Sequence, residues 1–171
     1  PLPPVAEDAL PASITGLSVD AMLTGSVVVS DVDSVLRGIA VTGVMGGGTW
    51  QCSVDGGVIW QPLPSLVGGQ AMVLAADGGG LNRLRYLPAP DENGNPAAKV
   101  MFRAWDRSDG AANGGLVAVA GAGVGTSALS AVELESPVTV TPINDAPSLD
   151  PGPVAGVFLL SGLFDQVAGA T

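Results

Sequence analysis

The residues best suited to chemistry in this chain are carboxylates, which lie in short groups outside the apolar runs. These groups are Glu7-Asp8, Asp31-Val32-Asp33, Asp106 and Asn144-Asp145. Calcium takes about six to eight oxygen ligands from flexible carboxylates and carbonyls, so the groups predict a calcium site if the fold gathers them at one pole. Taken singly, each group is equally typical of a solvated turn.

Other kinds of chemistry are poorly represented. The chain contains no histidine and a single cysteine, Cys52. Histidine is the commonest general base and transition-metal ligand, so a hydrolase triad and a zinc site are both disfavoured. Cys52 cannot form an intramolecular disulfide, and its position in a predicted strand favours a small buried apolar role. We therefore expect a protein that is not an enzyme.

The net charge excludes one class of partner. Six basic residues against sixteen acidic ones give a formal charge of −10. A surface of that sign repels phosphate backbones and anionic lipid headgroups, so no nucleic-acid partner is expected and cations suit it better. The most apolar run, Val154–Leu163, is too short to cross a bilayer, so no membrane span is expected either.

The elements that must position the carboxylates are short strands, and the clearest is a hairpin over Thr49–Leu63. On its first arm Trp50 and Cys52 alternate with polar residues, the period of a half-buried strand. An Asp-Gly-Gly run then supplies the positive φ values of a tight turn. On the second arm Val58 and Trp60 share a face, so both indoles are predicted to enter one core.

Similar strand and turn patterns recur along the chain. Further strands are predicted at Val27–Val29, Leu36–Val44, Ala71–Ala75, Arg83–Leu87, Val100–Asp106, Leu116–Ala120 and Ala131–Thr141. In the last of these Val132, Leu134, Val138 and Val140 face one way, while Pro137 requires a bulge or a place at a sheet edge. Because no amphipathic helix is convincing, the pattern predicts an all-β, immunoglobulin-like sandwich of seven or eight strands.

The composition also suggests how the chain is divided. Residues 1–13 read as an extended N-terminal linker, residues 14–141 as the sandwich, residues 142–153 as an inter-domain linker, and residues 154–171 as an apolar tail. The tail is interpreted either as the start of a next repeat or as a strand that joins the sheet edge of a neighbouring subunit.

Five elements of the sequence, in this order, resemble the cadherin-like repeats of long bacterial surface adhesins of the RTX and biofilm type. They are VSDVDS, GTWQCSVDGGVIWQPL, NRLRYLPAPDENG, FRAWDRSDG and VTVTPINDAPSL, within roughly Val5 to Leu149. The resemblance implies β-sandwiches joined end to end in an extracellular or cell-surface protein, with calcium stiffening the junctions. By position, it implies that the metal ligands are Glu7, Asp31, Asp33, Asp106, Asn144 and Asp145. The chain lacks a good equivalent of the DRE-type ligand segment of true cadherins.

Three functions are compatible with these patterns. The first is a calcium-stiffened structural module that contacts neighbouring repeats. The second is a module that binds glycan or peptide through its long loops, Pro88–Pro96 and Ser108–Gly125, with Trp105 as a sugar-stacking platform if it faces outward rather than into the core. The third is a homopolymeric filament subunit, linked head to tail to identical subunits through its tail strand.

The arginines allow two interpretations. Arg83, Arg85, Arg103 and Arg107 lie at strand positions opposite apolar residues. They either hold an acidic ligand or, as cross-strand pairing favours, form ion pairs with Glu133, Glu135 or Asp106.

Overall fold

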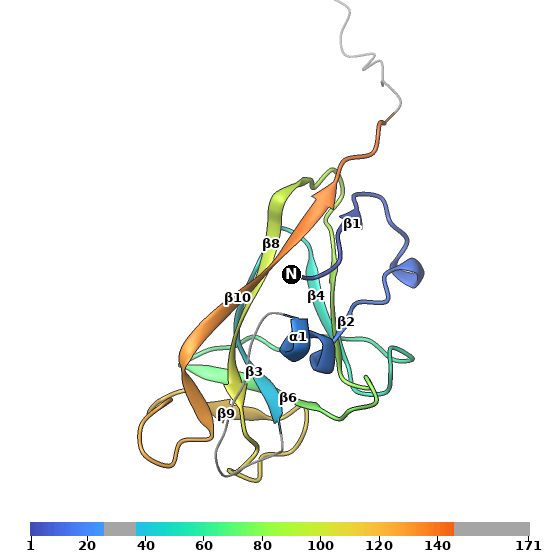
Figure 1. The fold of residues 1–171 in the computed structure, drawn as a ribbon. Coiled ribbons are helices and arrows are strands. Elements are labelled where there is room, and N and C mark those ends of the chain that lie inside the picture. The colour runs from blue at the N-terminus through green and yellow to red at the C-terminus, as the bar shows by residue number, and fades with distance from the viewer. Residues whose placement is uncertain (26–36, 146–171) are drawn as a thin grey trace, which may run out of the picture.

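The computed structural model describes residues 1–25 and 37–145 of the chain, which form two sheets (Figure 1). The six-stranded sheet has the order β1 (Val5–Ala6), β10 (Leu129–Thr141), β8 (Gly94–Trp105), β3 (Arg37–Met45), β6 (Gln70–Ala76) and β9 (Leu116–Ala118). The four-stranded sheet has the order β2 (Leu17–Ser18), β7 (Arg83–Leu87), β4 (Thr49–Ser53) and β5 (Gln61–Pro62). The predicted all-β, sandwich-like class is confirmed. The predicted strand Val27–Val29, the ligands Asp31 and Asp33, and the tail 154–171 lie outside the described residues.

The chain also forms a helix, α1 (Val19–Gly25), which the sequence patterns did not predict. Its apolar side chains Val19, Met22 and Leu23 are all buried, at the spacing of one helical face. The hydroxyl of Ser18 accepts the main-chain N–H of Ala21 at 3.2 Å, as an N-terminal cap does. Seven residues are too few for a clear helical period, which explains the missed prediction. No helix in the described part of the chain is long and apolar enough to span a membrane.

The six-stranded sheet is buried on both faces at its centre. From β6, Met72 and Leu74 enter the core between the two sheets, whereas Val73 packs on the outer face with Trp105 and Leu129. The glycine-rich segment 107–128 covers that outer face, placing Val117, Val119 and Ala122 against it. Its main chain is tied to β6, because the N–H of Gly114 donates to the oxygen of Val73 at 2.8 Å. The predicted surface loop is therefore a lid on a second core.

The second core settles the position of Trp105. Its side chain is 1% exposed, and its indole N–H donates to Asp109 Oδ1 at 3.0 Å. Of the two interpretations, burial is confirmed, and a sugar-stacking platform at this residue is wrong.

The predicted hairpin is confirmed on its first arm only. Trp50 and Cys52 are buried on β4, which pairs with β5. Val58 is 81% exposed, and Trp60 is half-buried in the loop before β5, so their predicted place in the core is wrong. The reason is the carboxylate of Asp55, which accepts the Ser53 hydroxyl and the N–H groups of Val58 and Ile59. These bonds widen the turn, and regular pairing resumes only at Gln61.

Strands β8 and β10 depart from simple alternation. Their register shifts between Leu129 and Glu133 and again between Val138 and Val140, so the predicted irregularity is present. The first shift turns Val132 outward, where it is 64% exposed, which corrects its predicted inward position. Strand β8 begins at Gly94, so the predicted loop Pro88–Pro96 is shorter than expected.

The N-terminal segment lies along the sandwich instead of leading away from it. Leu2 is buried, and its N–H donates to the oxygen of Pro137 at 3.2 Å. Strand β1 then pairs in parallel with β10, with Val5 opposite Val140. Residues 1–13, predicted to be an extended linker, are thus extended but packed, and include a 3-10 turn at Pro11–Ser13.

Substitution of a buried valine, Val73, and of an exposed one, Val132, tests whether the second core exists. Val73→Ala should lower the free energy of unfolding by about 2 kcal/mol, because it removes fully buried apolar surface under the 107–128 segment. Val132→Ala, at an exposed site, should change it by less than about 0.5 kcal/mol. Urea denaturation measures both. Equal effects of the two substitutions would show that the 107–128 segment does not cover β6.

Candidate metal centre

Three carboxylates converge at one end of the sandwich. Glu7, Asp91 and Asp145 each offer an oxygen atom, and these atoms lie within 4.8 Å of one another. Glu7 follows β1, Asp91 lies in the connection from β7 to β8, and Asp145 follows β10. We call these three residues the acidic cluster.

Strand pairing brings the three segments together. The parallel pairing of β1 with β10 ends with Ala6 opposite Thr141, so Glu7 and the residues after β10 leave the sheet side by side. The antiparallel pairing of β8 with β10 sets Gly94 opposite Val140, which brings the 88–93 connection to the same end. Figure 1 shows β1, the start of β8 and the end of β10 at that end of the molecule.

Glu7 is the most constrained member of the cluster. It is 7% exposed, and its main-chain N–H donates to the oxygen of Thr141 at 3.0 Å. Its Oε2 accepts the N–H of Ile143 at 3.1 Å, which ties the segment after β10 to the segment after β1. A buried carboxylate is costly unless it is paired or coordinates a cation.

Asp91 is positioned through its neighbour Glu92. The Tyr86 hydroxyl lies 2.7 Å from both carboxylate oxygens of Glu92, and that carboxylate also accepts the N–H groups of Gly47 and Ala89. With Glu92 held in this way, Asp91 adopts a φ of 60°, in the left-handed region that aspartate tolerates better than most residues.

The close approach of the 46–48 turn depends on glycine. A side chain at Gly48 would collide with the main-chain oxygen of Leu87. Because glycine has no side chain, the N–H of Gly48 donates to the hydroxyl oxygen of Tyr86 at 2.6 Å.

The acidic cluster is electrostatically strained. The described residues contain two salt bridges, Lys99–Glu135 and Arg103–Glu133, so no member of the cluster has a basic partner among them. The negative charge of Asp8 raises the pKa of Asp145 above its usual value, with smaller contributions from desolvation, Glu7 and Asp91. Ionisation of Asp145 therefore opposes folding in the absence of a cation.

The chemical type of the donor atoms in the acidic cluster suits calcium. All three side chains are carboxylates, the hard oxygen donors that calcium prefers, and they come from segments outside the rigid strands. Carboxylates that chelate through both oxygens supply most of the ligands such an ion needs, and main-chain oxygens and water commonly supply the rest. No nitrogen or sulfur ligand belongs to the cluster, which disfavours zinc.

The predicted ligands separate into three groups. Glu7 and Asp145 meet in the acidic cluster. Asn144 directly precedes Asp145, and its amide nitrogen donates to the main-chain oxygen of Asp145 at 3.2 Å. Asp31 and Asp33 lie outside the described residues. Asp106 follows the far end of β8, where Trp105 pairs with Leu129. At a strand rise of about 3.3 Å per residue, the two ends of this 12-residue strand are roughly 35 Å apart.

Asp106 is therefore not part of the acidic cluster, and the fold does not gather all the predicted ligands at one pole. Its Oδ1 accepts the N–H of Ser108 at 2.8 Å, the pattern of a local turn.

Asp91 is the member of the cluster that the sequence reasoning missed. The sequence places it in the predicted loop Pro88–Pro96, without a role as a ligand. The topology could have indicated Asp91. Because β8 and β10 are antiparallel, the connection that leads into β8 lies at the end where β10 finishes.

Comparison with known proteins does not identify this site. No family model, curated protein or solved structure matches the chain. The function is therefore argued from the site itself.

The bond from Tyr86 to Glu92 gives a test of how the Asp91 loop is held. Tyr86→Phe should lower the free energy of unfolding at neutral pH by about 1 to 3 kcal/mol, because Glu92 loses its side-chain donor. Burial opposes ionisation of Glu92, but the bonds from Tyr86, Ala89 and Gly47 outweigh it, so the pKa of Glu92 lies below its usual value.

A lowered folded-state pKa stabilises the protein above the unfolded value of about 4.3, and the stabilisation is lost as the pH falls through the folded value. The deficit of Tyr86→Phe, measured by urea unfolding, should accordingly shrink between pH 7 and pH 3. A deficit that is constant over this range would mean that Glu92 is not the partner that matters.

For Asp145 the predicted dependence of stability on pH has the opposite sign. Its raised folded-state pKa means that stability falls as the pH rises through the unfolded value of about 3.9 and stays lower above the folded one. In chelator at pH 7, Asp145→Asn should therefore melt at a higher temperature than the parent. The control Glu135→Gln, which loses an exposed bond to Lys99, should leave the melting temperature unchanged or slightly lower. A destabilised Asp145→Asn variant would contradict repulsion within the cluster.

Proposed function

We propose that this chain is a non-enzymatic structural module of an extracellular or cell-surface adhesin or filament, stiffened by calcium at the acidic cluster. The observation that carries the proposal is the origin of the three carboxylates. One lies near the start of the described chain, one in a connection between strands, and one where the described chain leaves the sandwich. A cation shared by these residues would fix the direction of the departing chain relative to the body of the module.

The departing segment has few other restraints. Residues 142–145, which follow β10, are all exposed, and the N–H of Ile143 ties them to the sandwich by donating to Glu7 Oε2 at 3.1 Å. Repulsion between Asp145 and its acidic neighbours loosens this contact. Calcium supplies positive charge and oxygen coordination, so it would neutralise the repulsion and link the three segments. The chain's own part is to hold Glu7 and Asp91 in place through β1 and Glu92.

The resemblance to cadherin-like adhesin repeats agrees with this arrangement. Two of the sequence elements that carry it, NRLRYLPAPDENG and VTVTPINDAPSL, contribute Asp91 and Asp145 to the cluster. The two-sheet, all-β architecture is the one that such a repeat needs. Neighbouring repeats or identical subunits, arranged head to tail, are the partners of this proposal.

The other two functions receive less support from the described residues. Binding of a glycan by Trp105 is incompatible with its burial, and the 107–128 segment is occupied in covering the sheet. Linkage through residues 154–171 stays a prediction, since that tail lies outside the described residues.

Calcium should raise the melting temperature of the protein, and chelator should lower it. At a concentration about one hundred times the dissociation constant, one site adds roughly 2.7 kcal/mol to the free energy of unfolding. For a chain of this length that corresponds to a shift of roughly 5 to 10 °C. Differential scanning calorimetry with and without calcium measures it.

Matched substitutions locate the site. Asp91→Asn should abolish most of the calcium-dependent shift, because it removes one of three ligands without adding bulk. Asp106→Asn, at the opposite end of β8, should keep the full shift. A response that survives Asp91→Asn but disappears in Asp106→Asn would overturn the proposed location, and no response in the parent would overturn the role of calcium.

A further inference from the structure

A second polar feature lies on the outer face of the four-stranded sheet. Arg83 and Arg85 stand two residues apart on β7, so their side chains leave the same face, while Leu84 and Tyr86 between and beyond them enter the core. Neither guanidinium is within salt-bridge distance of a carboxylate among the described residues. Of the predicted cross-strand ion pairs, Arg103–Glu133, with a 3.6 Å separation, is confirmed, whereas Arg83 and Arg85 follow a different arrangement.

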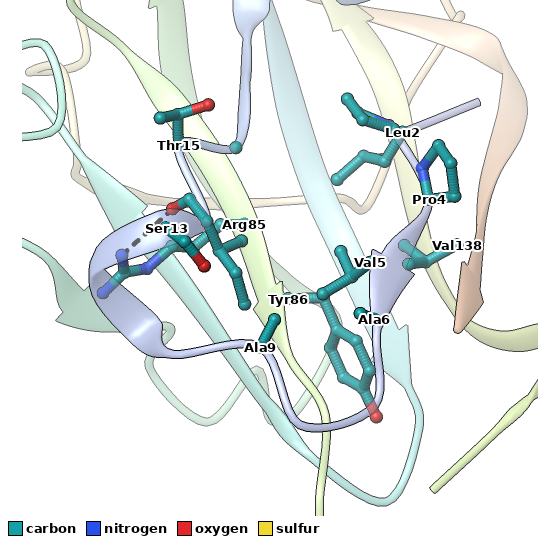
Figure 2. Close-up of a pocket in the computed structure, with 13 residues that line it drawn as sticks. Leu2, Pro4, Val5, Ala6, Ala9, Ser13, Thr15, Arg85, Tyr86 and Val138 are labelled. Atoms are coloured by element: carbon teal, nitrogen blue, oxygen red, sulfur yellow. Dashed lines mark hydrogen bonds between the residues drawn. The ribbon is translucent and has the colours of Figure 1, made fainter. Parts of the chain in front are cut away.

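Both arginines are bonded to the N-terminal segment through main-chain oxygens. Arg83 donates from Nε to Thr15 at 2.9 Å and from Nη2 to Gly16 at 3.2 Å. Arg85 donates from Nη1 to Pro11 at 2.7 Å and to Ile14 at 3.1 Å. In Figure 2 Arg85 reaches under this segment, and the dashed line marks its bond to Ile14. These bonds hold residues 11–16 over the sheet.

Arg85 is a buried cation that forms no salt bridge with a carboxylate of the described residues. It is 8% exposed, and desolvation lowers its pKa below the usual value. Carbonyl and amide oxygens solvate a buried guanidinium, but they carry no full negative charge to offset the cost of burial. The Nε group donates to Gln51 Oε1 at 2.8 Å, whereas Nη2 donates to no acceptor within residues 1–25 and 37–145. Arg85 Nη2 is thus a donor that has no acceptor among the described residues.

An open cleft of about 550 Å³ lies against these groups. Its walls include both arginines, Trp60, the apolar residues Pro11 and Ile14 of the N-terminal segment, and Val58 of the loop opposite. The guanidinium of Arg85 lies 4.1 Å from the centre of the Trp60 ring, which fixes one of its faces. Stacking of this kind covers a face of the guanidinium, and because Nε and Nη1 already have acceptors, Nη2 is the edge group that can donate to a ligand.

The acidic residues nearest to this end of the sheet do not fill the site. Asp55 accepts the N–H groups of Val58 and Ile59, and Asp77 accepts those of Gly79 and Leu81. Asp20 accepts the N–H groups of Gly78 and Gly80. Asp55 and Asp77 therefore bond within their own turns, and Asp20 bonds from α1 to the 78–80 turn, so none of the three forms a salt bridge with an arginine among the described residues.

A cavity of about 300 Å³ on the other side of Arg85 differs in chemistry. It lies between the N-terminal segment and the sandwich, and Leu2, Val5, Tyr86 and Val138 are among its mainly apolar lining (Figure 2). The two arginines border the larger cleft together, so the anion site belongs there.

We propose that the cleft formed by Arg83, Arg85 and Trp60 binds a uronate, the carboxylate-bearing sugar of an acidic glycan. The two guanidinium groups receive the carboxylate. The apolar wall of Pro11, Ile14 and Val58 contacts the C–H face of the sugar ring. The volume suits a ligand of one or two sugar units. This site shares no residue with the acidic cluster, so the two proposals are independent of each other.

The test uses the full chain in chelator, which removes any calcium-mediated contact between uronate and protein. Trigalacturonate should quench or shift the tryptophan fluorescence in a saturable way, whereas neutral trigalactose should not. Val58→Asp should weaken trigalacturonate binding at least ten-fold, because it places a negative charge in the cleft at a side chain that is 81% exposed. The control Val124→Asp, exposed to 72% on a different segment, should bind like the parent.

Each other outcome overturns the proposal. Absence of trigalacturonate binding, equal binding of the neutral sugar, or a Val58→Asp variant that binds like the parent would exclude a uronate site in this cleft. Tighter binding of triglutamate than of trigalacturonate would identify the ligand as an acidic peptide instead. Circular dichroism of Val58→Asp, expected to match the parent, ensures that a loss of binding is not a loss of folding.

Discussion

The parallel pairing of β1 with β10 is the contact on which the proposed site depends. It places Val5 opposite Val140, so the residues that follow each strand leave the sandwich together. This register sets Glu7 against the N–H of Ile143 and brings Asp145 beside it, while the antiparallel pairing of β8 with β10 adds Asp91 from the β7–β8 connection. A strand of two residues therefore decides where the charge collects, although it contributes little to the core.

The acidic cluster and the outer face of the four-stranded sheet hold their charged groups in different ways. At the acidic cluster, carboxylates are held close together by main-chain pairing and by the Glu92–Tyr86 bond, so their repulsion is balanced by the rest of the fold. On the outer face of the four-stranded sheet, arginines are held by main-chain oxygens without a carboxylate. Both sites concentrate one sign of charge beyond what the described chain neutralises, and this is why ions or charged groups from outside are the ligands proposed for them.

The class of fold was predictable because the alternation of apolar and polar residues is local. Strand β7 was found where that period is clean, β6 was found as a short apolar run, and burial of Trp50 and Cys52 followed from the alternation on β4. Strands β1 and β2 were missed because two residues carry no period. Val132 and Trp60 were misplaced for a related reason, since a bulge and a turn built on Asp55 change the facing of residues without a local apolar signal.

The site was predictable only in part. Glu7 and Asp145 were identified, yet Asp91 depends on which strands neighbour each other, and that is set by long-range pairing rather than by composition. For the same reason the sequence does not show that Asp106 lies at the other end of β8, away from the cluster. The most direct test is a crystal structure of the chain grown with calcium, examined for anomalous scattering. The account predicts a peak between the carboxylates of Glu7, Asp91 and Asp145, with oxygen ligands at about 2.3 to 2.6 Å. A map without that peak, in which the three carboxylates have moved apart, would contradict it.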